Sequence, residues 1–290
     1  MPIVWTIFGS LGHASAAVLF ASLAILTSRR GARTLEQQTL VVALALTALW
    51  SLRHALTGVV ITGPATDGLT ETMRNAAWLA VIGVRMMNMQ AGAPLRWGRP
   101  LVLGALVLLL LVQMTFDLLV GEGAPFHSKQ LSILSASWLL RCTFALGALV
   151  LLHGVSTKRD HPQAAQGEVW VAAALAFMWA YDFNHYILTW LSKGDGSVTG
   201  PMRGLVMALL TVPIVIGLRT DGRRRLALSR PVALRLVSGG VIALYLFAVV
   251  LLVSLTGDMI APFGRVMQLS VLFAMAVAVL ALMPSTALRS

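Results

Sequence analysis

The sequence predicts an all-α, polytopic membrane helix bundle of about nine transmembrane helices, with the N-terminus outside and the C-terminus in the cytoplasm. Three observations predict this class. Of the 290 residues, 58% are hydrophobic and 11% are charged, so polar residues are too few to cover a water-soluble domain of this size. The apolar residues gather in stretches of about 20, the length that crosses the hydrocarbon core. Basic residues are concentrated in alternate loops between these stretches.

Nine stretches have the length and composition of a membrane-spanning helix. The predicted spans are residues 3–27, 39–61, 70–89, 100–120, 131–155, 168–191, 202–218, 233–256 and 264–283. Together they predict that residues 1–290 form a single integral-membrane domain.

The first span could be mistaken for a secretory signal because Ala14, Ser15 and Ala16 resemble a cleavage site, but its flanking charges are reversed. No basic residue precedes it, whereas Arg29, Arg30 and Arg33 follow it. A signal peptide carries its positive charge in front of the apolar stretch, so we expect this segment to remain as an outside-to-inside span.

The loops that follow the odd-numbered spans carry most of the positive charge. Lys129 and Lys193 are the basic residues of the loops after the even-numbered spans. The positive-inside bias therefore places the odd-numbered loops in the cytoplasm. The basic residues of the cytoplasmic loops and tail are Arg29, Arg30, Arg33, Arg96, Arg99, Lys158, Arg159, Arg219, Arg223, Arg224, Arg225, Arg230, Arg235 and Arg289.

The lengths of the predicted outside loops and the position of one proline agree with this arrangement. The loops predicted to lie outside, residues 62–69, 121–130, 192–201 and 257–263, are too short to fold as a domain. Any ligand would therefore bind within the bundle or at its outer rim. Pro213 lies inside the seventh span, where it is expected to kink the helix.

Several functions are disfavoured by composition. The formal charge of +11 lies mainly in topology-setting flanks, which argues against nucleic-acid binding. No predicted span contains a lysine, so a retinal Schiff base is unavailable there. The histidines of the spans do not pair at haem-ligand spacing, and the single Cys142 excludes an internal disulfide. The sequence thus predicts no cofactor and no metal.

An intramembrane cysteine enzyme is the catalytic alternative. Cys142 follows Arg141, and a thiolate needs such a neighbouring cation or base. However, His153 lies eleven residues further along the same span, about 16 Å away along a helix axis. The catalytic reading is therefore weak.

Charged side chains inside the predicted spans indicate a polar cavity near the outer leaflet. Each costs several kcal/mol unless it is paired or hydrated. Most map to the outer half of their spans, and Arg265 of the ninth span does so too. The candidate cavity residues are Arg53, His54, Glu71, Arg74, Trp78, Asp117, Tyr181, Asp182, His185, Tyr186 and Arg203.

Helical spacing places several candidates on common faces. Glu71, Arg74 and Trp78 recur at three and four residues and so share one face of the third span. Asp182 and His185 share a face of the sixth span in the same way. We therefore predict that Asp182 pairs with Arg74 or Arg203.

Four aromatic residues are predicted to wall the cavity, namely Trp78, Trp179, Tyr181 and Tyr186. The alternative is that the charges form structural ion pairs and the aromatic rings are interfacial anchors. An inner-facing polar path, which a transporter would need, is indicated only by Arg85, Arg141 and Gln113.

Three motifs carry a resemblance to a known family. They are Glu71 to Leu79 (ETMRNAAWL), Trp179 to Phe183 (WAYDF) with Tyr186 following, and Arg203 to Val206 (RGLV). In this order they resemble the N-terminal membrane module of sensor histidine kinases of the PEP-CTERM/exosortase system, the PrsK type. Met207 stands where that family has asparagine.

The resemblance implies a function and partners. It implies a sensory module in the bacterial inner membrane that passes an envelope or exopolysaccharide-related signal to a cytoplasmic kinase, with membrane lipid around it. A kinase region is expected after residue 290, which implies a homodimer and a cognate response regulator. No catalytic residue is implied within residues 1–290, which carry no phosphoacceptor box or nucleotide-binding glycine motif.

The main alternative is a transporter or binding scaffold for an amphiphilic or anionic solute, because an outer polar cavity would serve it equally. The arginines of the predicted cavity favour an anionic headgroup, lipid or glycan as the ligand.

Overall fold

The computed structural model describes residues 2–29, 34–56, 64–90, 98–121, 127–156, 165–191 and 199–220. Within these ranges the elements are all helices. They are α1 (Pro2–Ser28), α2 (Leu35–Ala55), α3 (Pro64–Gln90), α4 (Gly98–Gly121), α5 (His127–Ser156), α6 (Ala165–Leu191) and α7 (Thr199–Thr220). The predicted eighth and ninth spans, residues 233–256 and 264–283, and Arg265 lie outside the described residues.

Within the described part of the chain, five helices are long and apolar enough to cross a membrane, which makes the fold compatible with a membrane protein. The qualifying segments are Gly9–Ser28, Leu35–Ala55, Pro100–Leu119, Ile133–His153 and Thr199–Leu218. The helices α3 and α6 do not qualify, and they are the two that carry Glu71, Arg74 and Asp182. Both helices bury polar side chains inside the bundle.

The distribution of side chains is the opposite of that in a water-soluble bundle. Val18, Leu108 and Leu111 are exposed, whereas Arg74 and Asp182 are fully buried. Large contiguous apolar surface is rare on soluble monomers, but lipid tails solvate it at no cost. The fold thus turns its polar groups inward.

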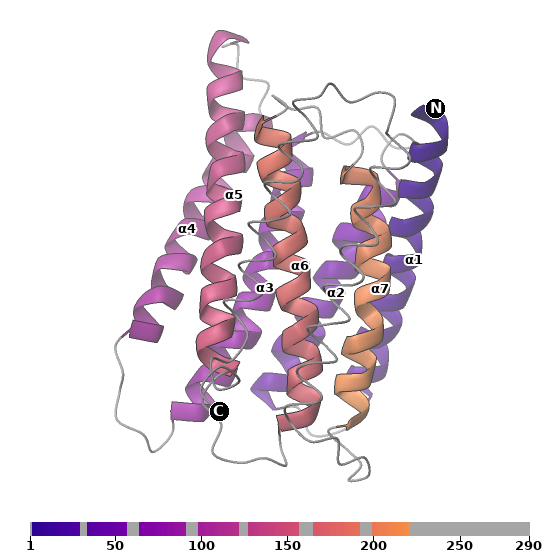
Figure 1. Cartoon of the computed structure of the whole chain (residues 1–290), viewed down its shortest axis with the longest axis vertical. Coiled ribbons are helices and arrows are strands. Elements are labelled where there is room, and N and C mark those ends of the chain that lie inside the picture. The colour runs from indigo at the N-terminus through magenta and orange to yellow at the C-terminus, as the bar shows by residue number, and fades with distance from the viewer. Residues whose placement is uncertain are drawn as a thin grey trace, which may run out of the picture.

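Several helices extend beyond the predicted spans. The helix α2 begins at Leu35 because the Thr34 hydroxyl accepts a hydrogen bond from the Gln37 amide at 3.2 Å and so caps it. It ends at Ala55 rather than continuing to residue 61, and residues 57–61 lie outside the described residues. The helix α5 begins at His127, four residues before the predicted start, and reaches past the other helices at the end where α1 begins (Figure 1).

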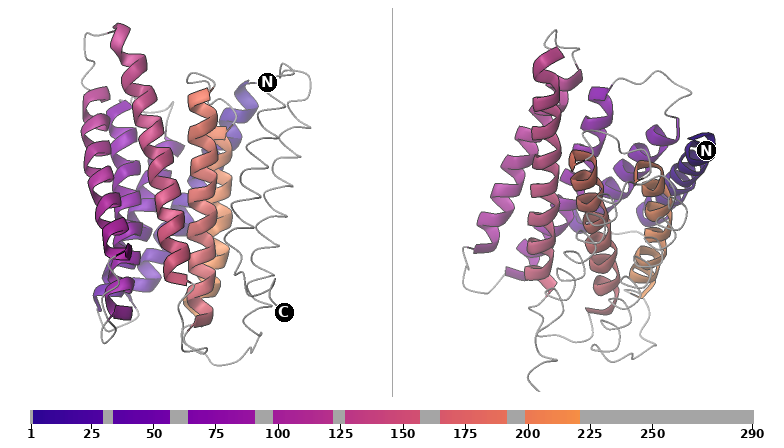
Figure 2. Two further views of the ribbon diagram at one scale, coloured as in Figure 1. Left: turned by 60° about the vertical axis from the view of Figure 1, so that its left-hand side comes forward. Right: turned by 45° about the horizontal axis from the view of Figure 1, so that its top comes forward.

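The described helices pack as a closed ring. Each helix contacts the next along the chain, and α7 returns to pack on α1. They run alternately up and down, with α1 and α4 at opposite edges of the bundle (Figures 1 and 2). The odd-numbered helices therefore begin, and the even-numbered helices end, at one common end, which we call the N-terminal end of the bundle.

The contact between α1 and α7 depends on glycine. A Cβ on Gly12 would lie 2.7 Å from the Leu205 nitrogen, and a Cβ on Gly204 would collide with the His13 backbone nitrogen. Small residues let two helix backbones approach closely, which favours association where no hydrophobic effect operates. This pair of glycines brings α1 and α7 into backbone contact and closes the ring.

Candidate functional site

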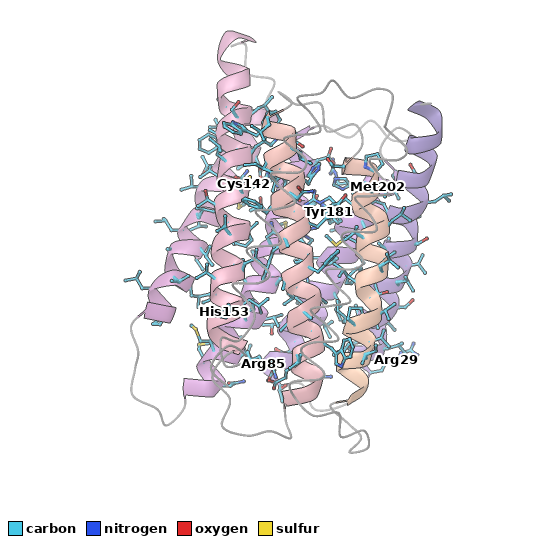
Figure 3. All side chains as sticks on the ribbon, viewed as in Figure 1. Arg29, Arg85, Cys142, His153, Tyr181 and Met202 are labelled. Atoms are coloured by element: carbon cyan, nitrogen blue, oxygen red, sulfur yellow. The ribbon has the colours of Figure 1, made fainter. Side chains whose placement is uncertain are left out.

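The buried charges of the described ranges lie at the N-terminal end of the bundle. They come from the N-terminal halves of α3, α5 and α7 and from the C-terminal halves of α4 and α6. Figure 3 shows Tyr181, Met202 and Cys142 in this half of the bundle and Arg29, Arg85 and His153 at the other end. The buried side chains are those of Arg74, Arg141, Arg203, Glu71, Asp117 and Asp182, which we call the charge network.

Asp182 accepts hydrogen bonds from two arginines. Its Oδ2 lies 2.5 Å from Nη2 of Arg74, and its Oδ1 lies 2.8 Å from Nε of Arg203. The sequence predicted either partner, and the fold supplies both. Because these residues come from α3, α6 and α7, one carboxylate ties three helices together.

Glu71 is the hub of the charge network. One of its oxygens, Oε2, accepts from Nη1 of Arg141 at 2.5 Å. The other, Oε1, accepts from Arg203 and from the Tyr186 hydroxyl, and Arg74 lies 3.5 Å away. Three guanidinium groups and a phenol thus converge on one carboxylate, which joins α3 to α5, α6 and α7.

Asp117 connects α4 to the same network. Its Oδ1 accepts from Nη2 of Arg141 at 2.6 Å and from Nε2 of Gln113 at 2.8 Å, and its Oδ2 accepts from the Thr72 hydroxyl at 2.5 Å. Gln113 also donates to the Ser137 hydroxyl at 2.8 Å. These donors fix the position of the Asp117 carboxylate and tie α4 to α3 and α5.

The network is balanced in charge. In the described ranges, the buried arginines and the buried carboxylates number three each. Removing one member would leave an uncompensated charge, which is costly in a low-dielectric interior. The balance therefore explains how so many ions are accommodated inside the bundle.

An aromatic and histidine cluster adjoins the network on the side of α1 and α2. The Cζ atoms of Arg74 and Arg203 lie 4.4 and 4.7 Å from the Trp50 ring centroid. His54 stacks on His13 with centroids 5.0 Å apart, and Trp50 contacts both rings. A ring face attracts a guanidinium that has lost its water, so Trp50 stabilises both arginines.

A polar cavity of about 220 Å³ adjoins the network. Its volume far exceeds the room that one water molecule needs. Six helices contribute residues to the wall of this cavity. Among the described lining residues, Leu134 carries the one aliphatic side chain. The lining residues are His54, Asp67, Gly68, Glu71, Asp117, Leu134, Ser137, Trp138, Arg141, His185, Tyr186 and Arg203.

Nine of the eleven predicted site residues lie at or beside the cavity, in three groups. The structure brings six of them to the cavity wall: His54, Glu71, Asp117, His185, Tyr186 and Arg203. Arg74 and Asp182 lie behind the wall, within the charge network. Arg53 lies at the rim, where its Nε is 2.5 Å from Oδ1 of Asp67, a wall residue.

Of the predicted aromatic wall, the described cavity lining includes Tyr186 alone. Trp78, Trp179 and Tyr181 do not line the cavity described here: Trp78 donates to the Thr47 hydroxyl at 2.9 Å, Trp179 packs on Phe144, and Tyr181 donates to the Thr199 carbonyl at 2.9 Å. All three rings are buried in helix contacts instead. The rings at the cavity are those of Tyr186 and Trp138.

The assignment of Arg141 and Gln113 to an inner path is wrong. Both belong to the N-terminal end of the bundle, where Arg141 lines the cavity and Gln113 holds Asp117. The first turns of α5 project past the other helices, so Arg141 lies level with the network although it is well inside its helix (Figure 1). Helical spacing would have linked Gln113 with Asp117 and Trp138 with Arg141.

The third residue of that predicted path, Arg85, lies at the opposite end of the bundle (Figure 3). Its Nη1 is 3.2 Å from Oε1 of Glu36, and it also pairs with Glu168. These contacts tie α2, α3 and α6 together. Between the two ends the core is apolar, with Leu44, Ile82, Phe144, Met207 and Ile214 all buried.

Gly68 is placed where a side chain would disturb the cavity. A Cβ there would lie 2.6 Å from Oδ1 of Asp117. We therefore expect Gly68→Ala to push that carboxylate away from Arg141 and to lower the unfolding free energy by about 1–3 kcal/mol. Thermal unfolding in detergent measures the change. Gly104→Ala, where a Cβ would meet nothing within 4 Å, is the control, and an equal loss in both variants would contradict the expectation.

No protein-family model, curated protein or solved structure matches this chain.

Proposed function

We propose that this chain is the membrane-embedded sensory module of a two-component sensor histidine kinase, and that it passes an envelope or exopolysaccharide-related signal to a cytoplasmic kinase. The proposal includes nine spans in the bacterial inner membrane, with the N-terminus outside. It rests on the three motifs that resemble the PrsK-type family and on the alternation of basic loops.

One structural observation carries the proposal further. Within the described ranges, the buried arginine, aspartate and glutamate side chains all lie at one end of the bundle, beside a cavity, and an apolar core separates them from the other end. A site without a polar path through the core of the described helices suits a protein that transmits a signal rather than a solute.

The helix α7 provides a mechanical connection for such a signal. Arg203, near its start, bonds to Glu71 on α3 and Asp182 on α6, and α7 then runs to the opposite end of the bundle. A ligand that binds one arrangement of these helices better than another shifts the population by its differential affinity. A change at the cavity would thus alter the position of α7 at the cytoplasmic face.

Four of the six members of the charge network belong to the motifs of the resemblance, and Tyr186, which bonds to Glu71, belongs to them too. Glu71 and Arg74 come from the first motif, Asp182 and Tyr186 from the second, and Arg203 from the third. Residues far apart in the sequence therefore meet in one network, which supports treating the three motifs as parts of a single site.

The decisive experiment is to sequence the source gene beyond codon 290. We expect the reading frame to continue into a helix with a phosphoacceptor histidine and then an ATP-binding domain. A stop codon at that point would contradict the proposal and favour a free-standing bundle.

The orientation has its own test, since Cys142 is the sole cysteine and is buried. In a Cys142→Ser background, Leu56→Cys should react with a membrane-impermeant maleimide in intact spheroplasts, whereas Leu35→Cys should react only after permeabilisation. Both positions are exposed and flank the same helix. The reverse pattern would overturn the predicted topology.

The alternative of a transporter or binding scaffold is supported by the same cavity. It predicts accumulation of an amphiphilic or anionic solute in proteoliposomes that contain the chain. We expect no uptake, because the apolar core beneath the network would have to open for a polar solute to pass.

A further inference from the structure

The charges of the cavity wall point to a ligand class different from the anion that the arginines of the sequence favour. We infer that the cavity binds a neutral, hydroxyl-rich molecule of about the size of one sugar ring. This inference deepens the proposed sensory function and rests on it for the biological role of binding.

An anion would find no cationic group that lacks a carboxylate partner among the guanidinium groups described at the cavity. Arg141 is bound by Glu71 and Asp117, and Arg203 is bound by Asp182 and Glu71. At the rim, Arg53 is bound by Asp67. An anionic ligand would have to displace a carboxylate from its arginine and leave that carboxylate buried without its partner, which is strongly unfavourable.

The described arginines and carboxylates at and behind the cavity wall sum to no net charge, so they attract neither sign. Arg53, Arg74, Arg141 and Arg203 are matched by Asp67, Glu71, Asp117 and Asp182. A permanently charged ligand, whether cation or anion, would add an unbalanced charge to this arrangement. A neutral ligand avoids that cost.

The wall nevertheless presents many hydrogen-bonding groups side by side. Carboxylates accept, guanidinium groups donate, and the hydroxyls of Ser137 and Tyr186 do both. A ligand hydroxyl also donates and accepts at once. Several hydroxyls on one small ring can therefore bond to neighbouring carboxylates and guanidinium groups without separating them.

Aromatic rings supply the second feature that such a ligand requires. Trp138 and Tyr186 line the cavity, and Tyr186 is held in place by its bonds to Glu71 and Arg203. The C–H face of a sugar or cyclic polyol is apolar and packs on an aromatic ring, while its hydroxyl edge meets polar groups.

The size and the described lining of the cavity favour a small polar ring over a lipid as the occupant. The volume of about 220 Å³ is below the range of roughly 300–1,000 Å³ of sites for drug-sized molecules. Leu134 is the one aliphatic side chain among the lining residues that the structure describes, so these residues offer an acyl chain little aliphatic surface.

The test uses the full chain in nanodiscs of zwitterionic lipid, with thermal unfolding and tryptophan fluorescence as readouts. The probes are glucose, myo-inositol, inorganic phosphate and choline, each at up to about 100 mM, which detects binding far weaker than micromolar. We expect glucose or myo-inositol to raise the unfolding midpoint and to change the fluorescence, and we expect phosphate and choline to do neither.

Substitutions at Trp138 locate the binding. Trp138→Ala should weaken it about tenfold, since the stacking surface is lost, whereas Trp138→Phe should retain it. Trp170→Ala is the matched control, because Trp170 lies near the start of α6 at the opposite end of the bundle. Equal weakening by Trp138→Ala and Trp170→Ala would place the binding elsewhere and overturn the inference.

Preferential stabilisation by phosphate or by choline would also overturn the inference, as would the absence of any effect of the two neutral probes. The result of this binding test is independent of the result of the sequencing test of the proposed function. A chain that binds a neutral ring compound but whose gene stops after codon 290 would retain the ligand class and lose the kinase role.

Discussion

Replacing Glu71 with glutamine is expected to lower the unfolding free energy of the bundle by about 3–5 kcal/mol, the cost of leaving a buried ion without its partner. Glutamine has nearly the same shape, so the loss reflects charge rather than packing. Arg141 and Arg203 both bond to this carboxylate, and the variant leaves the network with one excess positive charge. Denaturant or thermal unfolding in detergent measures the effect.

A matched substitution at the other end of the bundle separates this effect from a general one. Glu36 also pairs with an arginine, Arg85, but its side chain is 38% exposed. Solvent screens such a pair, so Glu36→Gln should cost less than about 1 kcal/mol. Similar losses in the two variants would contradict the assignment of Glu71 as the hub.

Charge balance also predicts that a second substitution, of the opposite charge, costs less stability once the first one is present, which a packing defect would not produce. Adding Arg203→Gln to Glu71→Gln removes one charge of each sign and leaves the pairs of Arg74 with Asp182 and of Arg141 with Asp117. The double variant should therefore lose less stability than the sum of the single losses, by at least about 1 kcal/mol of coupling. Additive losses would indicate that the charges act independently.

Replacing Gly204 with leucine is expected to open the ring between α1 and α7 and to cost more than about 3 kcal/mol, beyond the usual range for overpacking. The added Cβ would collide with the backbone nitrogen of His13, and a backbone atom cannot move aside as a flexible side chain can. Unfolding in detergent and the yield of folded protein measure the loss.

The control for this prediction is Gly104→Leu on α4. A Cβ at that glycine would meet nothing within 4 Å, so the same change in side-chain volume enters open space. It should leave stability nearly unchanged. A loss as large as that of Gly204→Leu would show that helical glycines in this chain tolerate no side chain, and the α1–α7 contact would then have no special role.

The two predictions address one route between the cavity and the opposite end of the bundle. Arg203 belongs to the charge network and Gly204, its neighbour, contacts α1. One turn of α7 is thus bound on one side by ion pairs and on the other by backbone packing. A ligand that alters the ion pairs would act on a helix whose position is otherwise closely constrained.

Much of the helical arrangement follows from composition and period alone. Seven of the predicted spans fall on the seven helices of the described residues, because a stretch of about 20 apolar residues has few other stable conformations. The helix ends were less predictable. Caps such as Thr34 and polar first turns extend helices past their apolar stretches, and hydropathy does not detect this.

The site was predicted in part. The spacing of charges along α3 and α6 indicated that Asp182 pairs with Arg74 or Arg203, since buried charges need partners. The aromatic wall was not predictable in the same way. Trp78, Trp179 and Trp138 are the same residue type, so residue type does not indicate which of them lines the cavity. Which ring faces the cavity depends on how the helices rotate against each other.

The sequence by itself therefore determined the class of fold, the order of the helices and the need for compensation of each buried charge, because these depend on residue type and helical period. The tertiary structure decided which charges meet. Arg141 joined Glu71 and Asp117 because α5 projects beyond its neighbours, and the glycines of α1 and α7 closed the ring. Relative height and rotation of helices arise from packing between them, and no single segment encodes them.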